Sequence, residues 1–427
     1  FFPGGESMSE SKAGGSDKLR KLLIVLAVLA VPVLAVLGVE AWRQVNEASS
    51  IEEVEHAYEG SLEYFDNPDD WNQYFRTRRE GTCGYDQYHD WGRDVKAKTE
   101  PNGEVRTWAV ALLEESTETP PTNDEATKFL ADSRPLVADA RKLLKYDYLD
   151  GAAQFQEGGD AAGDLDGIYG LRMLQTRVAI LHERGERAAA MNDLELLLEL
   201  TSRLQQPFGL LELLLMQVVE PDTMLAAGRM AETGPLSPKC RELIRTIAEA
   251  PESRGSVAAG ELAYFAWMYR EMGTEALSGH SKGGVNGGTS GWFHWFGKSG
   301  FTGAADLNRE IAADQQALLE YCRALKAGEK PAANTGMPAG LESNLRNTYG
   351  ELHMQRGRMV FVIRVREALD GGDPKALNAE ILKAGMLLEK QQDNWKVSFK
   401  YDEARFKELQ ISEQDFKKRF PPLLLRP

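Results

Sequence analysis

Residues that commonly bind metals or carry redox chemistry are scarce in this sequence. It contains three cysteines and six histidines in 427 residues. The cysteines (Cys83, Cys240 and Cys322) are far apart, so neither a CxxC redox motif nor a zinc knuckle is present. No two histidines stand one helical turn apart with a glutamate between them. We therefore predict no catalytic residue and no cofactor.

The same cysteines leave open whether a disulfide forms. A buried free thiol is the ordinary state of a cysteine that lies in a core. An exported chain can pair two of them, and Cys240 with Cys322 is the favoured pair because both fall on expected helices.

Positive charge is also in short supply. The formal net charge is −15 and the isoelectric point is near 5.1. No cluster of lysine and arginine interleaved with aromatic residues is present, so a phosphate-binding surface is not expected. Nucleic acid is therefore excluded as a main partner.

One long hydrophobic run stands out against this polar background. Leu22–Val39 has no charged or hydrogen-bonding side chain, and thirteen of its eighteen residues are Leu, Ile or Val. At ~1.5 Å per residue, a helix of this length covers about 27 Å, close to the ~30 Å hydrocarbon core of a bilayer. Trp42 follows as an interfacial anchor. Residues 22–42 are therefore predicted to be a transmembrane signal anchor and to contact the lipid bilayer.

The flanking charges predict how the anchor is oriented. Basic residues precede the run, whereas acidic residues dominate after it, and cationic side chains are retained on the cytoplasmic side. We expect a single-pass protein of the cytoplasmic (inner) membrane. Residues 1–21 would be a disordered cytoplasmic N-terminus, and the bulk of the chain would be extracytoplasmic. The alternative is a cleaved signal peptide, although signal peptides usually have a shorter apolar region.

Beyond the anchor, the sequence predicts a mainly α-helical fold. We expect a membrane-proximal mixed region at 43–123, a helical domain at 124–330, a linker at 331–340 and C-terminal helices at 341–427. Apolar residues at spacings of three and four indicate paired antiparallel helices in an irregular bundle or array.

Several helix boundaries are specific enough to check. Ser237 and Pro238 are typical of a helix start, and Gly185 of a helix end. Pro221 is expected to break the apolar helix that begins at Phe208. Further helices are predicted at Ala304–Ala327, Leu341–Leu369 and Pro374–Gln391, and a strand-like run at Trp395–Tyr401.

The central part of the chain resembles a known family. The matching segments are Glu183–Glu186, the leucine-rich Asp193–Leu200, the apolar Leu210–Val219, the Gly-Pro-Leu-Ser run Gly234–Ser237, and Gly260–Tyr264. Together with the N-terminal span, they resemble an uncharacterised planctomycete-type family of N-terminally membrane-anchored α-helical proteins. The resemblance implies a helical fold and implies no activity, because these segments are helix-packing features.

Two stretches are candidates for sites. Cys83, Asp86, His89 and Asp90 could all bind a transition metal, but their spacing fits no familiar site, so an aromatic-stapled loop is expected and no metal is predicted. The second is a loop at 279–303 with nine glycines in 25 residues. It carries four aromatic side chains that would contact the protein's own core, a membrane or a partner: Trp292, Phe293, Trp295 and Phe296.

The expected function is a structural or interaction module of the cell envelope, possessing no catalysis of its own and contacting an envelope protein partner. Two alternatives remain open. One is an enzyme with scattered catalytic residues, which a deep pocket lined by several of Glu212, Glu351, His353, Arg356 and Arg364 would favour. The other is a binding module for a lipid or hydrophobic ligand, which an unfilled apolar cavity beside Phe208–Val219 would favour.

Overall fold

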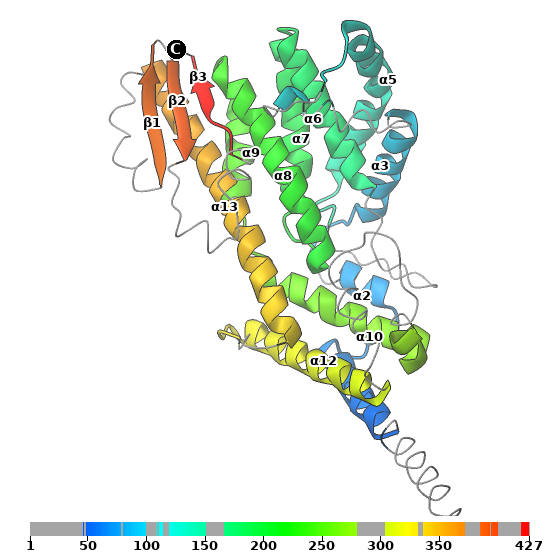
Figure 1. Ribbon diagram of the computed structural model, residues 1–427. Helices are drawn as coiled ribbons and strands as arrows, with labels where there is room; N and C mark the ends of the chain where they lie inside the picture. The colour runs from blue at the N-terminus through cyan, green and yellow to red at the C-terminus, as the bar shows by residue number, and fades with distance from the viewer. Residues whose placement is uncertain are drawn as a thin grey trace, which may run out of the picture. The chain divides into compact units, whose positions relative to one another are not determined.

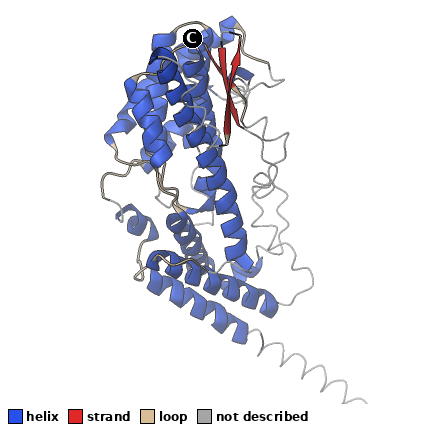
Figure 2. Ribbon diagram, turned by 90° about the vertical axis from the view of Figure 1, so that its left-hand side faces the viewer, coloured by secondary structure: helices blue, strands red, loops and turns tan. Residues whose placement is uncertain are grey.

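The protein is mainly α-helical, with one small antiparallel sheet (Figures 1 and 2). The computed structural model describes residues 46, 48–77, 80–99, 108, 111–113, 119–150, 166–279, 304–331, 336–371, 385–392, 394–399 and 420–426. The chain divides into two compact units. One consists of Phe1–Glu59 and Met272–Ala313, and the other of Gly60–Glu271 and Asp314–Pro427.

The helices follow one another along the chain with few strands between them. Residues 48–64 are helical. The later helices are α2 (Trp71–Thr77), α3 (Tyr85–Thr99), α5 (Asn123–Lys142), the short 3-10 helix η1 (Leu143–Lys145), α6 (Gly167–Glu183), α7 (Arg187–Ser202), α8 (Gly209–Glu232), α9 (Pro238–Glu249), α10 (Arg254–Gly279), α12 (Ala304–Ala327) and α13 (Gly336–Gly371).

Buried polar contacts join the helical segments of the first unit. Nδ2 of Asn308 donates a hydrogen bond to the hydroxyl of Ser50 at 3.1 Å, and both side chains are buried. Nε of Arg309 lies 3.3 Å from Oε1 of Glu53 on a more exposed side. These contacts connect helical residues 48–59 with the start of α12.

Local capping residues fix several helix ends in the second unit. Thr122 and Glu125 form a reciprocal capping box at the start of α5. The hydroxyl of Ser237 accepts a hydrogen bond from the backbone N–H of Cys240, and Pro238 is the first residue of α9, as predicted. Gly185 has a φ of +74°, a conformation that favours glycine, and it separates α6 from α7.

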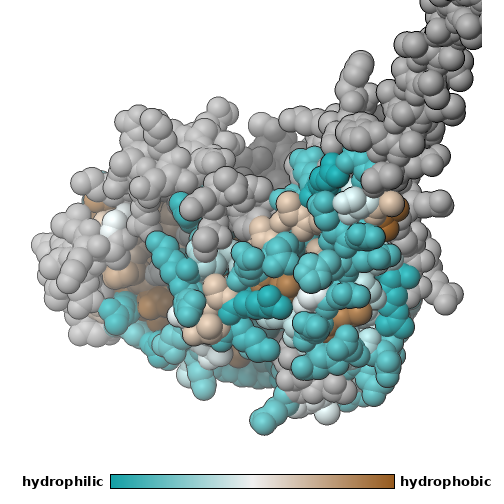
Figure 3. Space-filling model, turned by 90° about the horizontal axis from the view of Figure 1, so that it is seen from below, coloured by the Kyte–Doolittle hydropathy of each residue, from teal (hydrophilic) through white to brown (hydrophobic). Residues whose placement is uncertain are grey.

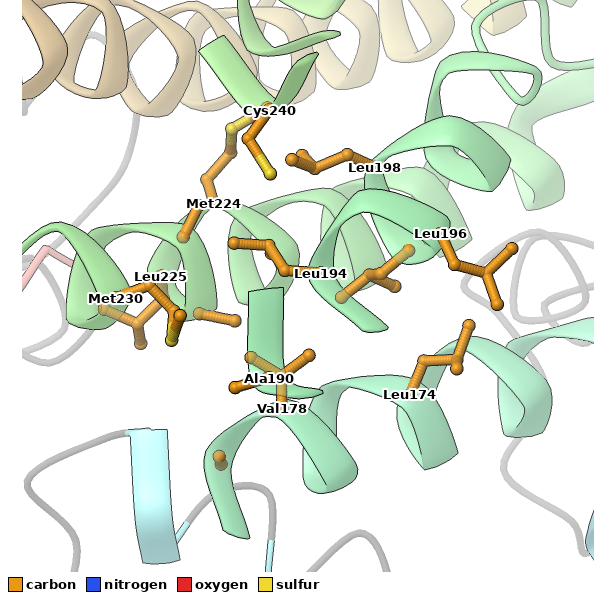
Figure 4. Close-up of a cluster of buried hydrophobic side chains, with 14 of the residues drawn as sticks. Leu174, Val178, Ala190, Leu194, Leu196, Leu198, Met224, Leu225, Met230 and Cys240 are labelled. Carbon is orange, nitrogen blue, oxygen red and sulfur yellow. The ribbon is translucent and has the colours of Figure 1, made fainter. Parts of the chain in front are cut away.

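The core of this unit lies where α6, α7, α8 and α9 meet. Figure 4 shows side chains from all four helices in one cluster. Leu174 and Val178 come from α6, Leu194 and Leu198 from α7, and Met224 from α8, and all five are at most 1 % exposed. Burial of this kind is the main force that stabilises a helical fold, since each fully buried side chain contributes about 1.5–3 kcal/mol.

Three short strands form an antiparallel sheet in the order β1 (Met386–Gln391), β2 (Asn394–Phe399) and β3 (Leu423–Leu425). Lys390 pairs with Trp395, and Trp395 with Leu425. β3 lies against the end of α8, where the backbone N–H of Leu424 donates a hydrogen bond to Oε1 of Glu232 at 2.9 Å.

Several predicted elements are wrong. α8 continues through Pro221, and residues 336–340 of the predicted linker begin α13. The predicted helix Pro374–Gln391 ends in strand β1, which pairs with β2. The predicted loop after Cys83 becomes helix α3 at Tyr85. The strand predicted near Trp395 and the helix Ala304–Ala327 are confirmed.

The sequence left open whether Cys240 and Cys322 form a disulfide, and the structure shows both as thiols that form none. Cys240 is buried on α9, with its Sγ 3.6 Å from Sδ of Met191, and Cys322 is buried on α12. Burial raises the pKa of the Cys240 thiol to about 11 and that of Cys322 to about 12. Both therefore behave as small apolar core residues.

Among the residues that the structure describes, no helix is long and apolar enough to cross a membrane. The predicted anchor, Leu22–Val39, and residues 1–21 lie outside them. On the face shown in Figure 3, the described surface is mostly hydrophilic, with small hydrophobic areas between polar side chains. Val218 and Leu424 are exposed large hydrophobic residues, at 42 % and 41 %.

Candidate functional site

A pocket lies among α3, α6, α7 and α8, within the second unit. Its cavity volume is about 50 Å³. The lining is mainly apolar, with a few polar side chains: Tyr85, Tyr88, His89, Leu149, Asp150, Ile168, Leu171, Thr201, Leu204, Pro207, Glu212, Leu215, Met216, Val219 and Glu220.

Two carboxylates of the lining are held by the segment that joins α7 to α8. Oε2 of Glu212 accepts a hydrogen bond from the backbone N–H of Phe208 at 2.5 Å. Oδ2 of Asp150 accepts one from the backbone N–H of Gln206 at 2.6 Å. Both donors are backbone N–H groups, so these bonds fix the orientation of the two carboxylates in the lining.

Tyr88 presents a buried phenol to the same pocket. The side chain is only 6 % exposed, and its hydroxyl makes no hydrogen bond to any residue in the described part of the chain. Burial, followed by the negative charges of Glu212 and Asp150, holds the pKa of Tyr88 well above its usual range. The phenol is therefore neutral, and its oxygen and proton are both available to a molecule in the pocket.

His89 follows Tyr88 on α3 and is 7 % exposed. Its Nδ1 accepts a hydrogen bond from the backbone N–H of Gly167 at 3.4 Å, and its ring lies 4.2 Å from that of Tyr85. Because a nitrogen that accepts a hydrogen bond is unprotonated, this contact favours the neutral imidazole.

Glycines let α3 approach α6 closely enough to build this wall. A Cβ on Gly92 would lie 2.0 Å from the carbonyl oxygen of Asp166. A Cβ on Gly167 would lie 2.2 Å from the ring of Tyr88. The ring of Tyr88 therefore occupies space that any larger residue at position 167 would fill.

A buried ion pair forms the other wall. Nε and Nη2 of Arg356, on α13, lie 2.6 and 2.9 Å from the two carboxylate oxygens of Glu220, and the side chains are 2 % and 0 % exposed. Oε1 of Gln205 accepts a second hydrogen bond from Nη2 of Arg356 at 2.6 Å. The charge of Glu220 is thus neutralised within the protein.

On its other side, Arg356 lines an open groove between α9 and α13. Of the five residues that the sequence offered for an enzyme site, three line this groove: His353, Arg356 and Arg364. Glu212 lines the pocket instead, and Glu351 accepts a hydrogen bond from Gln217 at 2.8 Å. His353 itself lies 2.8 Å from Glu252, in a partly exposed pair.

The four metal candidates occupy different surroundings. Cys83 precedes α3 and forms an isolated bridge with Tyr148. Asp86 lies in the first turn of α3, Asp90 pairs with Arg93 at the surface, and His89 turns into the pocket. Within the described ranges, no three His, Cys, Asp or Glu side chains lie close enough to hold a metal ion.

The aromatic residues Trp292, Phe293, Trp295 and Phe296 lie outside the described residues. The segment before them, Gly279–Gly283, has the Gly-x-Ser-x-Gly spacing of a hydrolase nucleophile elbow. Such an elbow follows a strand, whereas Gly279 is the last residue of helix α10. The spacing therefore does not indicate a hydrolase.

Sequence reasoning missed Tyr85, Tyr88 and Asp150. Positions 85, 88 and 89 recur at helical spacing and would have placed the two tyrosines beside His89 once α3 was recognised. Asp150 had no local signal.

No family model, no curated protein and no solved structure matches this chain.

Proposed function

We propose that this protein is a membrane-anchored helical module that binds a small, largely apolar molecule in the pocket among α3, α6, α7 and α8. The observation that carries the proposal is the pocket itself. Its walls include Ile168, Leu171, Leu204, Leu215 and Met216, and only a few polar groups interrupt them. Small-molecule sites usually combine a mainly apolar lining with a few placed polar groups.

The cost of keeping such a space open supports this function. Protein interiors are close-packed, and an unfilled cavity destabilises the fold by roughly 24 cal/mol per Å³. For a cavity of 50 Å³, this is about 1 kcal/mol. A neutral phenol without a hydrogen bond adds a further cost at Tyr88. A bound molecule would offset both.

The setting proposed for this module follows from the sequence. Leu22–Val39 would span the inner membrane with the N-terminus inside, and the helical units would act outside the cytoplasm as an interaction module of the envelope. The membership of the planctomycete-type family remains part of this proposal. The exported side suits capture of small molecules that pass through an envelope.

An enzyme is the weaker candidate. The groove between α9 and α13 gathers His353, Arg356 and Arg364, but two of them are already engaged. Arg356 is fully committed to Glu220 and Gln205, and His353 pairs with Glu252. These pairings explain the residues as structural, so catalysis has no further support from the groove.

A pair of tryptophan variants on α8 tests the pocket. Leu215→Trp places an indole in the lining, whereas Val218→Trp adds the same indole to an exposed position of the same helix. Fluorine NMR of 2-(4-fluorophenyl)ethanol with the full-length chain in mild detergent measures binding, with protein-free detergent as background. We expect saturable binding that Val218→Trp retains and Leu215→Trp loses.

Circular dichroism establishes that both variants keep their helices. Binding that survives Leu215→Trp would place the probe elsewhere and refute the proposed site. A linear, unsaturable response of the unaltered chain equal to that of detergent alone would refute ligand binding altogether.

A further inference from the structure

Tyr88 contributes to the pocket lining a hydroxyl that has no hydrogen-bond partner in the described part of the chain. The side chain is only 6 % exposed, and burial is the largest cause that keeps the pKa of Tyr88 well above its usual range. The phenol therefore carries its proton at neutral pH. A buried O–H group without an acceptor destabilises a fold, so this hydroxyl is placed to donate to a molecule that enters the pocket.

Packing between α3 and α6 holds the ring of Tyr88 in place. A Cβ on Gly167 would lie 2.2 Å from this ring, so the backbone of α6 lies directly against it. The ring centroids of His89 and Trp91, also on α3, lie 5.2 and 6.2 Å away, and Nε1 of Trp91 donates a hydrogen bond to the carbonyl of Leu136 at 2.9 Å. A group that packing already fixes loses little entropy when a ligand binds, so the hydroxyl is a pre-organised donor.

The walls around this donor are mainly apolar, with Ile168, Leu171, Leu204 and Leu215 among them. An ionised head group is far more costly to transfer into apolar surroundings than a neutral carbonyl. A carbonyl oxygen carries no proton, so a single O–H donor satisfies it, whereas an alcohol also brings a donor that needs an acceptor of its own. A carbonyl compound is therefore the ligand that one phenol between apolar walls fits best.

We propose that the pocket selects apolar molecules that carry a carbonyl group, with the carbonyl oxygen accepting a hydrogen bond from Tyr88 and the hydrocarbon body lying against the leucine-lined walls. This inference rests on the proposed function, since it names the ligand class of the same pocket. It adds a polar requirement, because a purely hydrophobic pocket would bind a hydrocarbon of the same shape equally well.

Two probes of similar shape test this requirement: 4′-fluoroacetophenone and 1-fluoro-4-isopropylbenzene, in which a methyl group replaces the carbonyl oxygen. Fluorine NMR with the full-length chain in mild detergent at neutral pH gives a dissociation constant for each. Each probe is compared with itself between the unaltered chain and Tyr88→Phe, so its partition into detergent cancels. We expect Tyr88→Phe to weaken binding of the ketone about five- to tenfold and to change that of the hydrocarbon by less than about twofold.

Tyr169→Phe is the matched control. It removes the same hydroxyl from a tyrosine of α6 that lies outside the pocket lining, where Nζ of Lys96 is 4.7 Å from the centroid of its ring. This variant should leave both dissociation constants unchanged. Circular dichroism establishes that both variants keep their helices.

A second measurement uses the unaltered chain, so it does not depend on how a variant folds. Difference infrared spectra of 4′-fluoroacetophenone with and without ¹³C at its carbonyl report the C=O stretch of the bound ketone, after subtraction of protein-free detergent. A hydrogen bond from a phenol lowers this frequency. We expect the bound band to lie below that of the ketone in cyclohexane, and a band at the cyclohexane frequency would overturn the inference.

The outcomes separate the two proposals. Failure of both probes to bind the unaltered chain refutes the proposed function and this inference with it. Binding of both probes that Tyr88→Phe leaves unchanged, or weakens equally, refutes only the inference. An equal loss of ketone binding in Tyr169→Phe would also overturn it, since the effect would then not come from the hydroxyl in the pocket.

Discussion

The buried pair of Arg356 and Glu220 allows a sharp test of how α8 and α13 are held together. Its two charges are 2 % and 0 % exposed, so removing one partner strands the other in a water-poor interior. Breaking such a pair typically costs about 3–5 kcal/mol. We expect Glu220→Leu and Arg356→Met each to destabilise the protein by about that amount.

The double variant should be more stable than either single variant. It leaves no unpaired charge in the interior. It loses the hydrogen bond from Arg356 to Gln205 and a weaker one from Arg356 to the carbonyl of Ala250 at 3.3 Å. These losses amount to about 1–3 kcal/mol. The coupling energy between positions 220 and 356 should therefore be at least about 3 kcal/mol.

Urea unfolding followed by tryptophan fluorescence measures this cycle, with the midpoint and slope recorded for all four proteins. Additive effects, with the double variant the least stable of the four, would refute the reasoning. Such a result would mean that water reaches the pair in solution and that each charge is stabilised independently of the other.

Two further predictions concern neighbouring contacts. Gly92→Ala should lower the free energy of unfolding in urea by about 3 kcal/mol, because its Cβ would clash with the Asp166 carbonyl. Gly357→Ala, which has open space around it, should raise the free energy of unfolding by about 0.5–1 kcal/mol. Equal effects of the two variants would contradict this account. Burial, opposed by a hydrogen bond from the N–H of Leu210, raises the pKa of Glu261 to about 7. A raised carboxyl pKa stabilises the fold at low pH, and this contribution is lost as pH rises through 7, so stability should fall by about 1–3 kcal/mol between about pH 5 and pH 8. Glu261→Gln should flatten that dependence, and an unchanged slope would refute it.

Helix positions could be predicted wherever the signal was local. Ser237 and Pro238 start α9 because a hydroxyl cap and a proline need only the following turn. Gly185 ends α6 for the same kind of reason. The bounds Ala304–Ala327 of α12 are those predicted, since its apolar spacing and the glycine after it lie within one segment.

Signals that depend on distant residues were read wrongly. Pro221 does not end α8, where Nε2 of Gln175 donates to the nearby carbonyl of Val219 at 3.0 Å and packing against α6 holds the helix. The stretch after Cys83 was expected to be a loop, although it forms α3, where Gly92 lets α6 pass close to the helix. Neither partner is near in sequence, so periodicity could not reveal them.

The candidate site was predictable only in part. An apolar cavity beside Phe208–Val219 was an expected mark of a ligand-binding module, and the pocket lies there, lined by Glu212, Leu215 and Met216. Further polar side chains of the lining come from α3 and from Asp150, which lie there because α3, α6 and α7 meet in three dimensions. Single-sequence reasoning had no means of bringing these segments together.

The ion pair also removes the charge of Glu220 from its effect on the pocket. Stability alone does not require Arg356 and Glu220, because well-packed apolar residues in such positions are often as stable. Glu220 lines the pocket on one side, and Arg356 lines the groove between α9 and α13 on the other. The pair therefore acts as a neutral wall between the two spaces. Because this wall cancels its own charge, Glu220 is not among the causes that raise the pKa of Tyr88, which are burial and the charges of Glu212 and Asp150.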